Sequence, residues 1–121
     1  MSENKKILLV DDEPDIALAF SLGLESNGFS VDAYTSSIKA LANFQSDFYK
    51  LALLDIKIPE MDGLELYKKI REKDKKIKIC FISAYDVDHH IVKEYSSCII
   101  KKPITIDDLV KKINKEMQEW D

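Results

Sequence analysis

The stretch "LALLDIKIPEMDG", residues 51–63, decides the fold of this chain. Its first four residues are all apolar, which is typical of a strand that is buried on both faces of a parallel sheet. The apolar run ends on one carboxylate, Asp55, and the turn-forming residues Pro59 and Gly63 follow it. A buried strand that ends on an acid requires an explanation, so we ask which other residues the fold brings to Asp55.

Three further apolar runs, at 7–10, 79–82 and 98–100, share this continuous pattern. The segment 29–35 alternates apolar and polar residues instead, which predicts an edge strand that is less completely covered. Helical patterns separate the strands, and they lie at 14–26, 37–46, 64–73, 87–95 and from 106 onward. This alternation predicts a doubly wound α/β sheet with helices on both faces.

Length and composition indicate one ordinary globular domain, which we expect to span residues 1–121. The chain has 121 residues, of which 45% are hydrophobic and 33% charged, and its formal net charge is −4. This charge gives no reason to expect direct nucleic-acid binding. The apolar stretch near the N-terminus is too short for a secretory signal, and no apolar run is long enough to cross a bilayer. We therefore expect a cytoplasmic protein without membrane insertion.

Both cysteines, Cys80 and Cys98, lie inside apolar runs. Free cysteine is among the most frequently buried residues, and the spacing of this pair matches no disulfide or metal-binding motif. We therefore expect two buried, reduced thiols. His89 and His90 occupy adjacent positions of a predicted helix and point apart, which favours two surface residues over metal ligands.

Polar side chains follow four of the predicted strands. They are Asp11, Asp12 and Glu13 after the first strand, Asp55 after the third, Ser83 after the fourth, and Lys101 and Lys102 after the fifth. Ligands of doubly wound sheets bind outside the carboxyl ends of the strands. We therefore expect these side chains to meet at one edge of the sheet.

Such a group of side chains suits phosphoryl transfer. Neighbouring carboxylates need a cation between them, and oxygen ligands with an open side suit Mg²⁺. A lysine and a hydroxyl can bind phosphoryl oxygens, and the Asp55 carboxylate can form an acyl phosphate. Taken alone, each residue is explained at least as well as a helix cap, a turn or a surface lysine. Their joint placement at strand ends favours the site.

The motifs "ILLVDDEPDI", "LALLDIKIPEMDGLEL", "FISA" and "IKKPI" lie at these strand ends. With them the chain resembles the receiver domain of two-component response regulators, from Lys5 to about Gln118. The resemblance implies a flavodoxin-like, five-stranded parallel sheet of order 2-1-3-4-5 with five helices. The segment from Ser83 to Lys102 is a few residues short, so we expect a shortened fourth helix.

The resemblance also implies a phosphorylation switch that depends on Mg²⁺. Asp55 would accept a phosphoryl group from a histidine kinase or a histidine phosphotransfer protein. Asp12 and Asp55 would ligate Mg²⁺ directly, with Asp11 acting through water and the backbone carbonyl of Lys57 as a further ligand. The domain would then act as a phosphoacceptor, with only self-phosphorylation and slow self-dephosphorylation chemistry, and not as an enzyme.

On the phosphoryl side, the resemblance assigns Ser83 and Lys102 to the phosphoryl oxygens, with Lys101 as the lesser candidate. It also implies a cis peptide bond before Pro103, since cis bonds are readily formed only before proline. A downstream protein would bind the face formed by the fourth helix, the fifth strand and the fifth helix.

Three positions are specific to this chain. The family usually has an aromatic residue at the switch position that Ile99 occupies here, so the usual aromatic reporter of phosphorylation is missing. Lys57 and Tyr85 follow Asp55 and Ser83 by two residues each. We expect Tyr85 to shield the phosphoryl group from water and Lys57 to change the local field, although exposed loop positions are also an ordinary reading.

Three other functions are weighed against a phosphoacceptor. The first is a receiver-like scaffold that binds partners without phosphorylation. The second is a phosphohydrolase with an aspartyl nucleophile, but those enzymes carry Asp-x-Asp after the first strand and need a cap. A flavodoxin-like cofactor protein would need a Ser/Thr/Gly-rich loop after the first strand. The domain is expected to stand alone, or to have been cut from a longer regulator.

Overall fold

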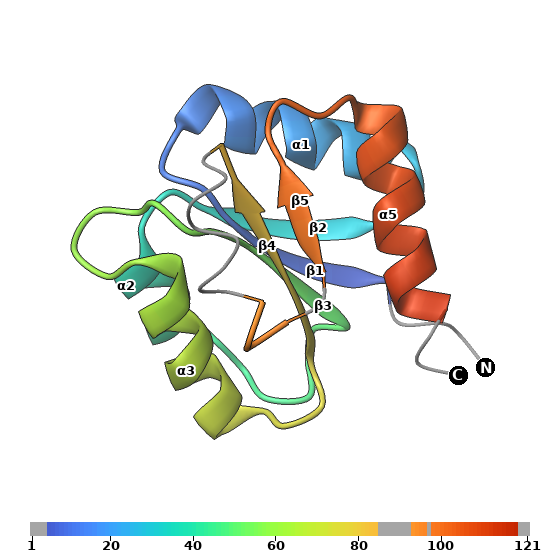
Figure 1. Ribbon diagram of the computed structural model, residues 1–121. Helices are drawn as coiled ribbons and strands as arrows, with labels where there is room; N and C mark the ends of the chain where they lie inside the picture. The colour runs from blue at the N-terminus through green and yellow to red at the C-terminus, as the bar shows by residue number, and fades with distance from the viewer. Residues whose placement is uncertain (1–4, 85–92, 97, 119–121) are drawn as a thin grey trace.

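The computed structural model describes residues 5–84, 93–96 and 98–118 (Figure 1). Its elements in chain order are β1 (Lys6–Val10), α1 (Pro14–Ser26), β2 (Ser30–Tyr34), α2 (Ser37–Ala42), β3 (Leu51–Asp55), α3 (Gly63–Lys73), β4 (Lys78–Ser83), β5 (Ile99–Lys101) and α5 (Ile106–Gln118). The helix predicted at 87–95, its shortening, and the residues Tyr85, His89 and His90 fall outside the described residues, except that 93–95 form a turn.

All five strands form one parallel sheet in the order β2-β1-β3-β4-β5, as predicted. Every residue of the central strand β3 is buried, whereas β2 at the edge has no buried residue. The continuous apolar runs therefore include the three central strands and also the short edge strand β5, whereas the alternating run marks the other edge strand, β2. None of the described helices combines the length and the apolar character that crossing a bilayer requires.

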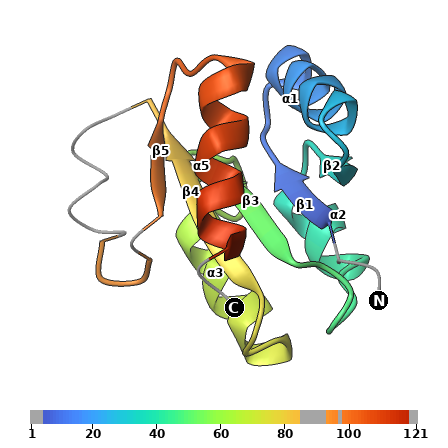
Figure 2. The same ribbon diagram turned by 90° about the vertical axis from the view of Figure 1, so that its right-hand side faces the viewer.

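Helices cover both faces of the sheet, with α1 and α5 on one face and α2 and α3 on the other (Figures 1 and 2). Successive residues of β1 explain why both faces are apolar. Ile7 and Leu9 pack in the cluster that includes α1 and α5, while Leu8 and Val10 pack in the cluster that includes α2 and α3. A strand with helices on both sides needs apolar side chains at every position.

Helix ends follow their sequence signals, with one exception. Pro14 begins α1, and Gly28 after its end has a φ of 93°. The Asp108 amide donates to the hydroxyl of Thr105 at 3.1 Å, so Thr105 caps the start of α5. The helix predicted at 37–46 ends at Ala42. Beyond it the side-chain amide of Asn43 donates to the Lys39 carbonyl at 2.9 Å, and the Phe44 amide bonds to the Leu41 carbonyl, three and not four residues back.

The oxidation state of the two cysteines differs from the prediction. Both are buried as predicted, with exposed fractions of 0% for Cys80 and 1% for Cys98, but they form a disulfide with each other. Parallel pairing of β4 with β5 places Phe81 opposite Ile99, so the residues before them are also neighbours. A separation of 18 residues along the chain gave no sign of this, because the sheet and not a local motif creates the pair.

Asp74 anchors the start of β4. Its Oδ1 accepts hydrogen bonds from the amides of Lys76 and Ile77 at 2.9 and 3.1 Å. Its Oδ2 accepts one from the amide of Asp47 at 3.0 Å, which ties the loop before β3 to the end of α3. Burial alone would raise the pKa of Asp74, but these bonds and the charge of Arg71 outweigh it, and the pKa is lowered.

We expect Asp74→Asn to lower the free energy of unfolding by about 2 kcal/mol at pH 7, because an amide cannot accept all three bonds. A lowered pKa means that the ionised carboxylate stabilises the fold above the unfolded-state pKa. This contribution is lost as the pH falls through the native value, so the difference should narrow below about pH 4. Urea unfolding at both pH values measures it. Asp107→Asn, at an exposed position, is the control, and an equal loss in both variants would contradict the assignment.

Candidate functional site

The predicted polar residues meet at the carboxyl edge of the sheet. Asp11 directly follows β1, Asp55 ends β3, Ser83 ends β4, and Lys102 follows β5. The strand register places Asp55 beside Ile82, and Ser83 beside Lys101. Neighbouring strands therefore end at nearly the same level, which brings residues far apart in the sequence together.

Lys102 lies at the centre of this edge. Its Nζ is 2.8 Å from Asp11 Oδ2, 3.1 Å from Asp55 Oδ2 and 3.5 Å from Glu13 Oε1. Asp11 is fully buried and Asp55 is 4% exposed, so both carboxylates lack bulk water around them. The neighbouring Lys101 is exposed and belongs to β5. Of the two lysines, the structure therefore brings Lys102 to the carboxylates.

The two oxygens of each buried carboxylate have different partners. Asp11 Oδ1 accepts a hydrogen bond from the Glu13 amide at 3.0 Å, and Asp55 Oδ1 accepts one from the Lys57 amide at 3.1 Å. The Oδ2 atom of each faces the Lys102 ammonium. The first oxygen thus fixes the loop that follows the strand, and the second binds the shared cation.

Gly63 allows the loop after β3 to fold back over Asp55. Its amide donates to the carbonyl of Ile56 at 3.0 Å, and the Ile56 amide donates to the carbonyl of Ile82 at 3.0 Å. A Cβ at position 63 would collide with the Asp55 carbonyl oxygen and lie 2.9 Å from Ile56 Cα. Glycine is required here by this close approach of two backbone segments.

Burial raises the pKa of Asp55 to about 6, and the nearby charge of Asp11 adds to the effect. The hydrogen bond and charge of Lys102 and the bond from the Lys57 amide oppose it only in part. For Lys102 itself, burial lowers the pKa, but the two carboxylates outweigh burial and the net pKa is raised. The lysine is therefore held as a cation, while Asp55 is ionised at a cost in free energy.

Four acidic residues form a cluster suited to a metal ion. Asp11, Asp12, Glu13 and Asp55 each offer a carboxylate oxygen, and these atoms lie within 4.8 Å of one another. Carboxylate oxygens are the ligands that Mg²⁺ prefers, and the partly exposed Asp12 and exposed Glu13 leave one side open to water. This donor set fits Mg²⁺. Sequence reasoning did not place Glu13 in the ligand set, although its position two residues after Asp11 was a signal.

The remaining predicted positions lie on β4, on β5 and in the loops that follow β3 and β5. Ser83 is fully buried, and its carbonyl accepts a hydrogen bond from the Lys102 amide at 2.9 Å. The peptide bond between Lys102 and Pro103 is cis, as the resemblance implies. Ile99 is partly buried and packs against the cluster that contains Phe81. Lys57 has an exposed side chain.

Fold and site together define a doubly wound α/β domain with an acidic cluster and a partly buried lysine at its carboxyl edge. The family model described as "Response regulator receiver domain" matches residues 7–114. The chain therefore belongs to the response regulator receiver domain family. Receiver domains of this family are phosphoacceptor signalling switches of two-component systems, and the non-phosphorylated scaffold is not favoured.

Individual relatives agree with this family. The chain is 32% identical over 116 residues to the response regulator receiver protein CpdR of Brucella abortus, covering 92% of this chain and 95% of CpdR. It is 32% identical over 113 residues to the C4-dicarboxylate transport transcriptional regulatory protein DctD of Rhizobium meliloti, covering 91% of this chain. The chain spans only 25% of the length of DctD.

A solved structure supports the same fold. The response regulator protein TrrA of Thermotoga maritima, in complex with Mg²⁺-BeF, is similar to this chain with a TM-score of 0.82 and 31% identity. The similarity covers 93% of this chain and 98% of TrrA.

We expect Asp55→Asn to stabilise the metal-free protein at pH 8 by about 2 kcal/mol. A raised pKa means that the fold favours the neutral acid, so ionisation reduces stability as the pH rises from about 4 through about 6. The gain should therefore vanish near pH 4. Urea unfolding in EDTA at both pH values measures it, with the exposed Glu72→Gln as the control for charge. A variant that is less stable than the parent at pH 8 would contradict the assignment.

Proposed function

We propose that Asp55 is the phosphoacceptor of this receiver domain. The observation that carries the proposal is the Lys102 ammonium, which lies within 3.1 Å of both Asp11 and Asp55 at the carboxyl edge of the sheet. Phosphoryl transfer depends mainly on positioning and on neutralising charge, and this edge offers a buried carboxylate with a cation in contact. A phosphohistidine on a histidine kinase or a phosphotransfer protein is the natural donor for such a site.

In the proposed step, a carboxylate oxygen of Asp55 attacks phosphorus, a P–O bond forms, and the P–N bond to the histidine breaks. The imidazole leaves and takes up a proton. Mg²⁺, when bound, would neutralise charge on the phosphoryl oxygens. Asp12 and Asp55, with Asp11 through water and the Lys57 carbonyl, would hold it.

Lys102 and Ser83 would hold the transferred group. The ammonium of Lys102 already faces Asp55 Oδ2 at 3.1 Å, so it would contact a phosphoryl oxygen once the carboxylate is modified. The Ser83 side chain, at the end of the neighbouring strand, would bind another oxygen. A movement of either residue on phosphorylation would be transmitted to the end of β5, because the Lys102 amide is hydrogen-bonded to the Ser83 carbonyl.

Rate tuning and output complete the proposal. The side chain of Lys57 would change the field at the acyl phosphate, and Tyr85 would shield it from water. A downstream protein would bind near β5 and α5, and the domain would act in the cytoplasm, where it meets its kinase. With Ile99 at the switch position, an aliphatic side chain that packs beside Phe81 would transmit the change.

We expect incubation with acetyl phosphate or phosphoramidate and Mg²⁺ to add one phosphoryl group per chain, measured by intact mass. Asp55→Asn should abolish the gain, because an amide cannot form the acyl phosphate. Asp107→Asn, an exposed acid on α5, is the matched control and should be phosphorylated normally. No gain in the parent protein, or an equal gain in Asp55→Asn, would reject the proposal.

The two adjacent lysines give a second matched test. We expect Lys102→Ala to slow phosphorylation by acetyl phosphate by about tenfold or more, because it removes the cation that contacts Asp55. Lys101→Ala should stay within about twofold of the parent rate. Rates come from intact mass against time. Equal slowing in both variants would show that general positive charge, and not the Lys102 contact, is responsible.

A further inference from the structure

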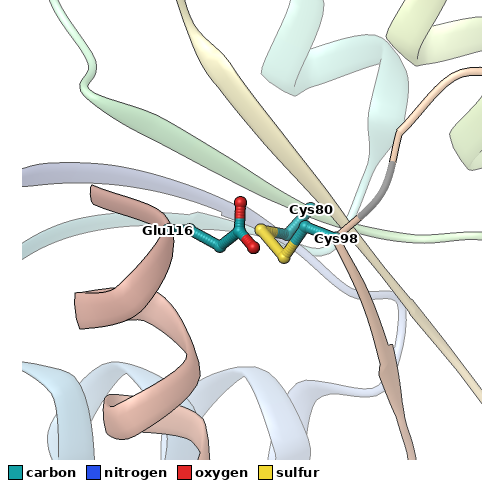
Figure 3. A group of neighbouring side chains, drawn as sticks. All are labelled: Cys80, Cys98 and Glu116. Atoms are coloured by element: carbon teal, nitrogen blue, oxygen red, sulfur yellow. A yellow bond between two sulfur atoms is a disulfide. The ribbon is translucent and has the colours of Figure 1, made fainter. Parts of the chain in front are cut away.

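A second group of chemically reactive side chains lies in the core, away from the acidic cluster. It consists of the Cys80–Cys98 disulfide between β4 and β5 and the carboxylate of Glu116 on α5, which points toward the sulfur atoms (Figure 3). A carboxylate oxygen and the two sulfur atoms lie within 4.8 Å of one another, and all three residues are buried. The proposed phosphorylation chemistry does not use this group.

The disulfide holds one end of a short edge strand. β5 has only three residues and pairs on one side, with β4. Its register with β4 comprises three residue pairs, from Phe81 and Ile99 to Ser83 and Lys101. Cys98 directly precedes this ladder and Lys102 directly follows it. A three-residue edge strand is held by few hydrogen bonds, so the covalent link adds to the bonds that hold Lys102 in place, among them that from its amide to the Ser83 carbonyl.

The Glu116 carboxylate favours the reduced form of this cysteine pair. Its Oε2 is buried and has no hydrogen bond, although the ammonium of Lys78 lies 3.7 Å away as an ion-pair partner. A buried acceptor without a donor is unfavourable. The disulfide offers no hydrogen, whereas a thiol at Cys80 or Cys98 can donate to the neighbouring Glu116 carboxylate. The reduced pair therefore gains a hydrogen bond that the oxidised pair lacks.

We propose that Cys80, Cys98 and Glu116 form a reversible dithiol/disulfide site that sets how firmly β5 carries Lys102 at the phosphoryl site. An external dithiol would reduce the bond by thiol–disulfide exchange. The Cys80–Cys98 S–S bond breaks, the external dithiol becomes a cyclic disulfide, and two electrons and two protons pass to the cysteines. Reduction removes the covalent link at this end of β5 and leaves hydrogen bonds such as that from the Phe81 amide to the Cys98 carbonyl, so Lys102 is less firmly positioned over Asp55. This effect on phosphorylation rests on the proposed function.

The redox chemistry is tested without reference to phosphorylation. The native protein is equilibrated without oxygen in mixtures of reduced and oxidised dithiothreitol, then quenched with acid, unfolded and alkylated for intact mass. We expect a reversible transition between no added alkyl group and two. A bond that persists in excess reduced dithiothreitol until the chain unfolds would overturn the proposal, as would thiols that stay free in every mixture. Uptake of one zinc ion that protects both thiols would also overturn it, in favour of a metal site.

The role of Glu116 is tested by a matched pair of variants. Glu116→Met removes the acceptor and keeps a side chain of similar size. Reduction of the disulfide should then require a ratio of reduced to oxidised dithiothreitol that is about threefold higher than for the parent, or more. Glu116→Gln keeps an acceptor oxygen and should stay within about twofold of the parent ratio. Equal shifts in both variants would overturn the role of the acceptor.

Coupling to the phosphoryl site is tested on the parent protein in its two redox forms, which needs no variant to fold. We expect acetyl phosphate to phosphorylate the reduced form at about one third of the rate of the disulfide form, or more slowly. The double variant Cys80→Ala and Cys98→Ala should match the reduced form in any mixture. Equal rates in both redox forms would overturn the coupling. If neither form is phosphorylated, the proposed function fails, while the alkylation result still decides the redox site.

Discussion

One ammonium group holds the site together, because Lys102 Nζ lies between the buried carboxylates of Asp11 and Asp55. Without a cation, two buried carboxylates would repel each other, and one of them would be protonated. Even with it, burial keeps the pKa of Asp55 at about 6. The sheet therefore holds the acid in an unfavourable ionised state, and added positive charge or a covalent change at Asp55 relieves it.

The position of that lysine depends on the weakest part of the sheet. β1 and β3 are central strands whose side chains are buried on both faces, so Asp11 and Asp55 are rigidly placed. Lys102 follows β5, a three-residue edge strand. Hydrogen bonds from β4 and the Cys80–Cys98 disulfide hold this strand. Because the carboxylates are rigidly placed and the lysine is less firmly held, the redox site at the other end of β5 bears on the phosphoryl site.

Most of the site could be predicted from the sequence, because parallel strands bring their carboxyl ends to one edge. The continuous run 51–54 identified β3, and Asp55 after it identified the site. Features made by pairing between distant segments could not be predicted. The Cys80–Cys98 bond depends on the β4–β5 register, which no local motif announces. The resemblance already favoured Lys102 over Lys101, and the coordinates add the contacts that Lys102 makes with the carboxylates. The early end of α2 is accompanied by a local bond from the Asn43 side chain to the Lys39 carbonyl, which the helical spacing of apolar residues does not reveal.

The most direct measurement of the central claim is to locate the phosphoryl group. The protein is treated with acetyl phosphate and Mg²⁺ and then with borohydride, which reduces an aspartyl phosphate to homoserine, and its peptides are sequenced by mass spectrometry. The account predicts homoserine at position 55 and at no other aspartate. Conversion at Asp11 or Asp12, or no conversion in protein that has gained a phosphoryl group, would contradict it.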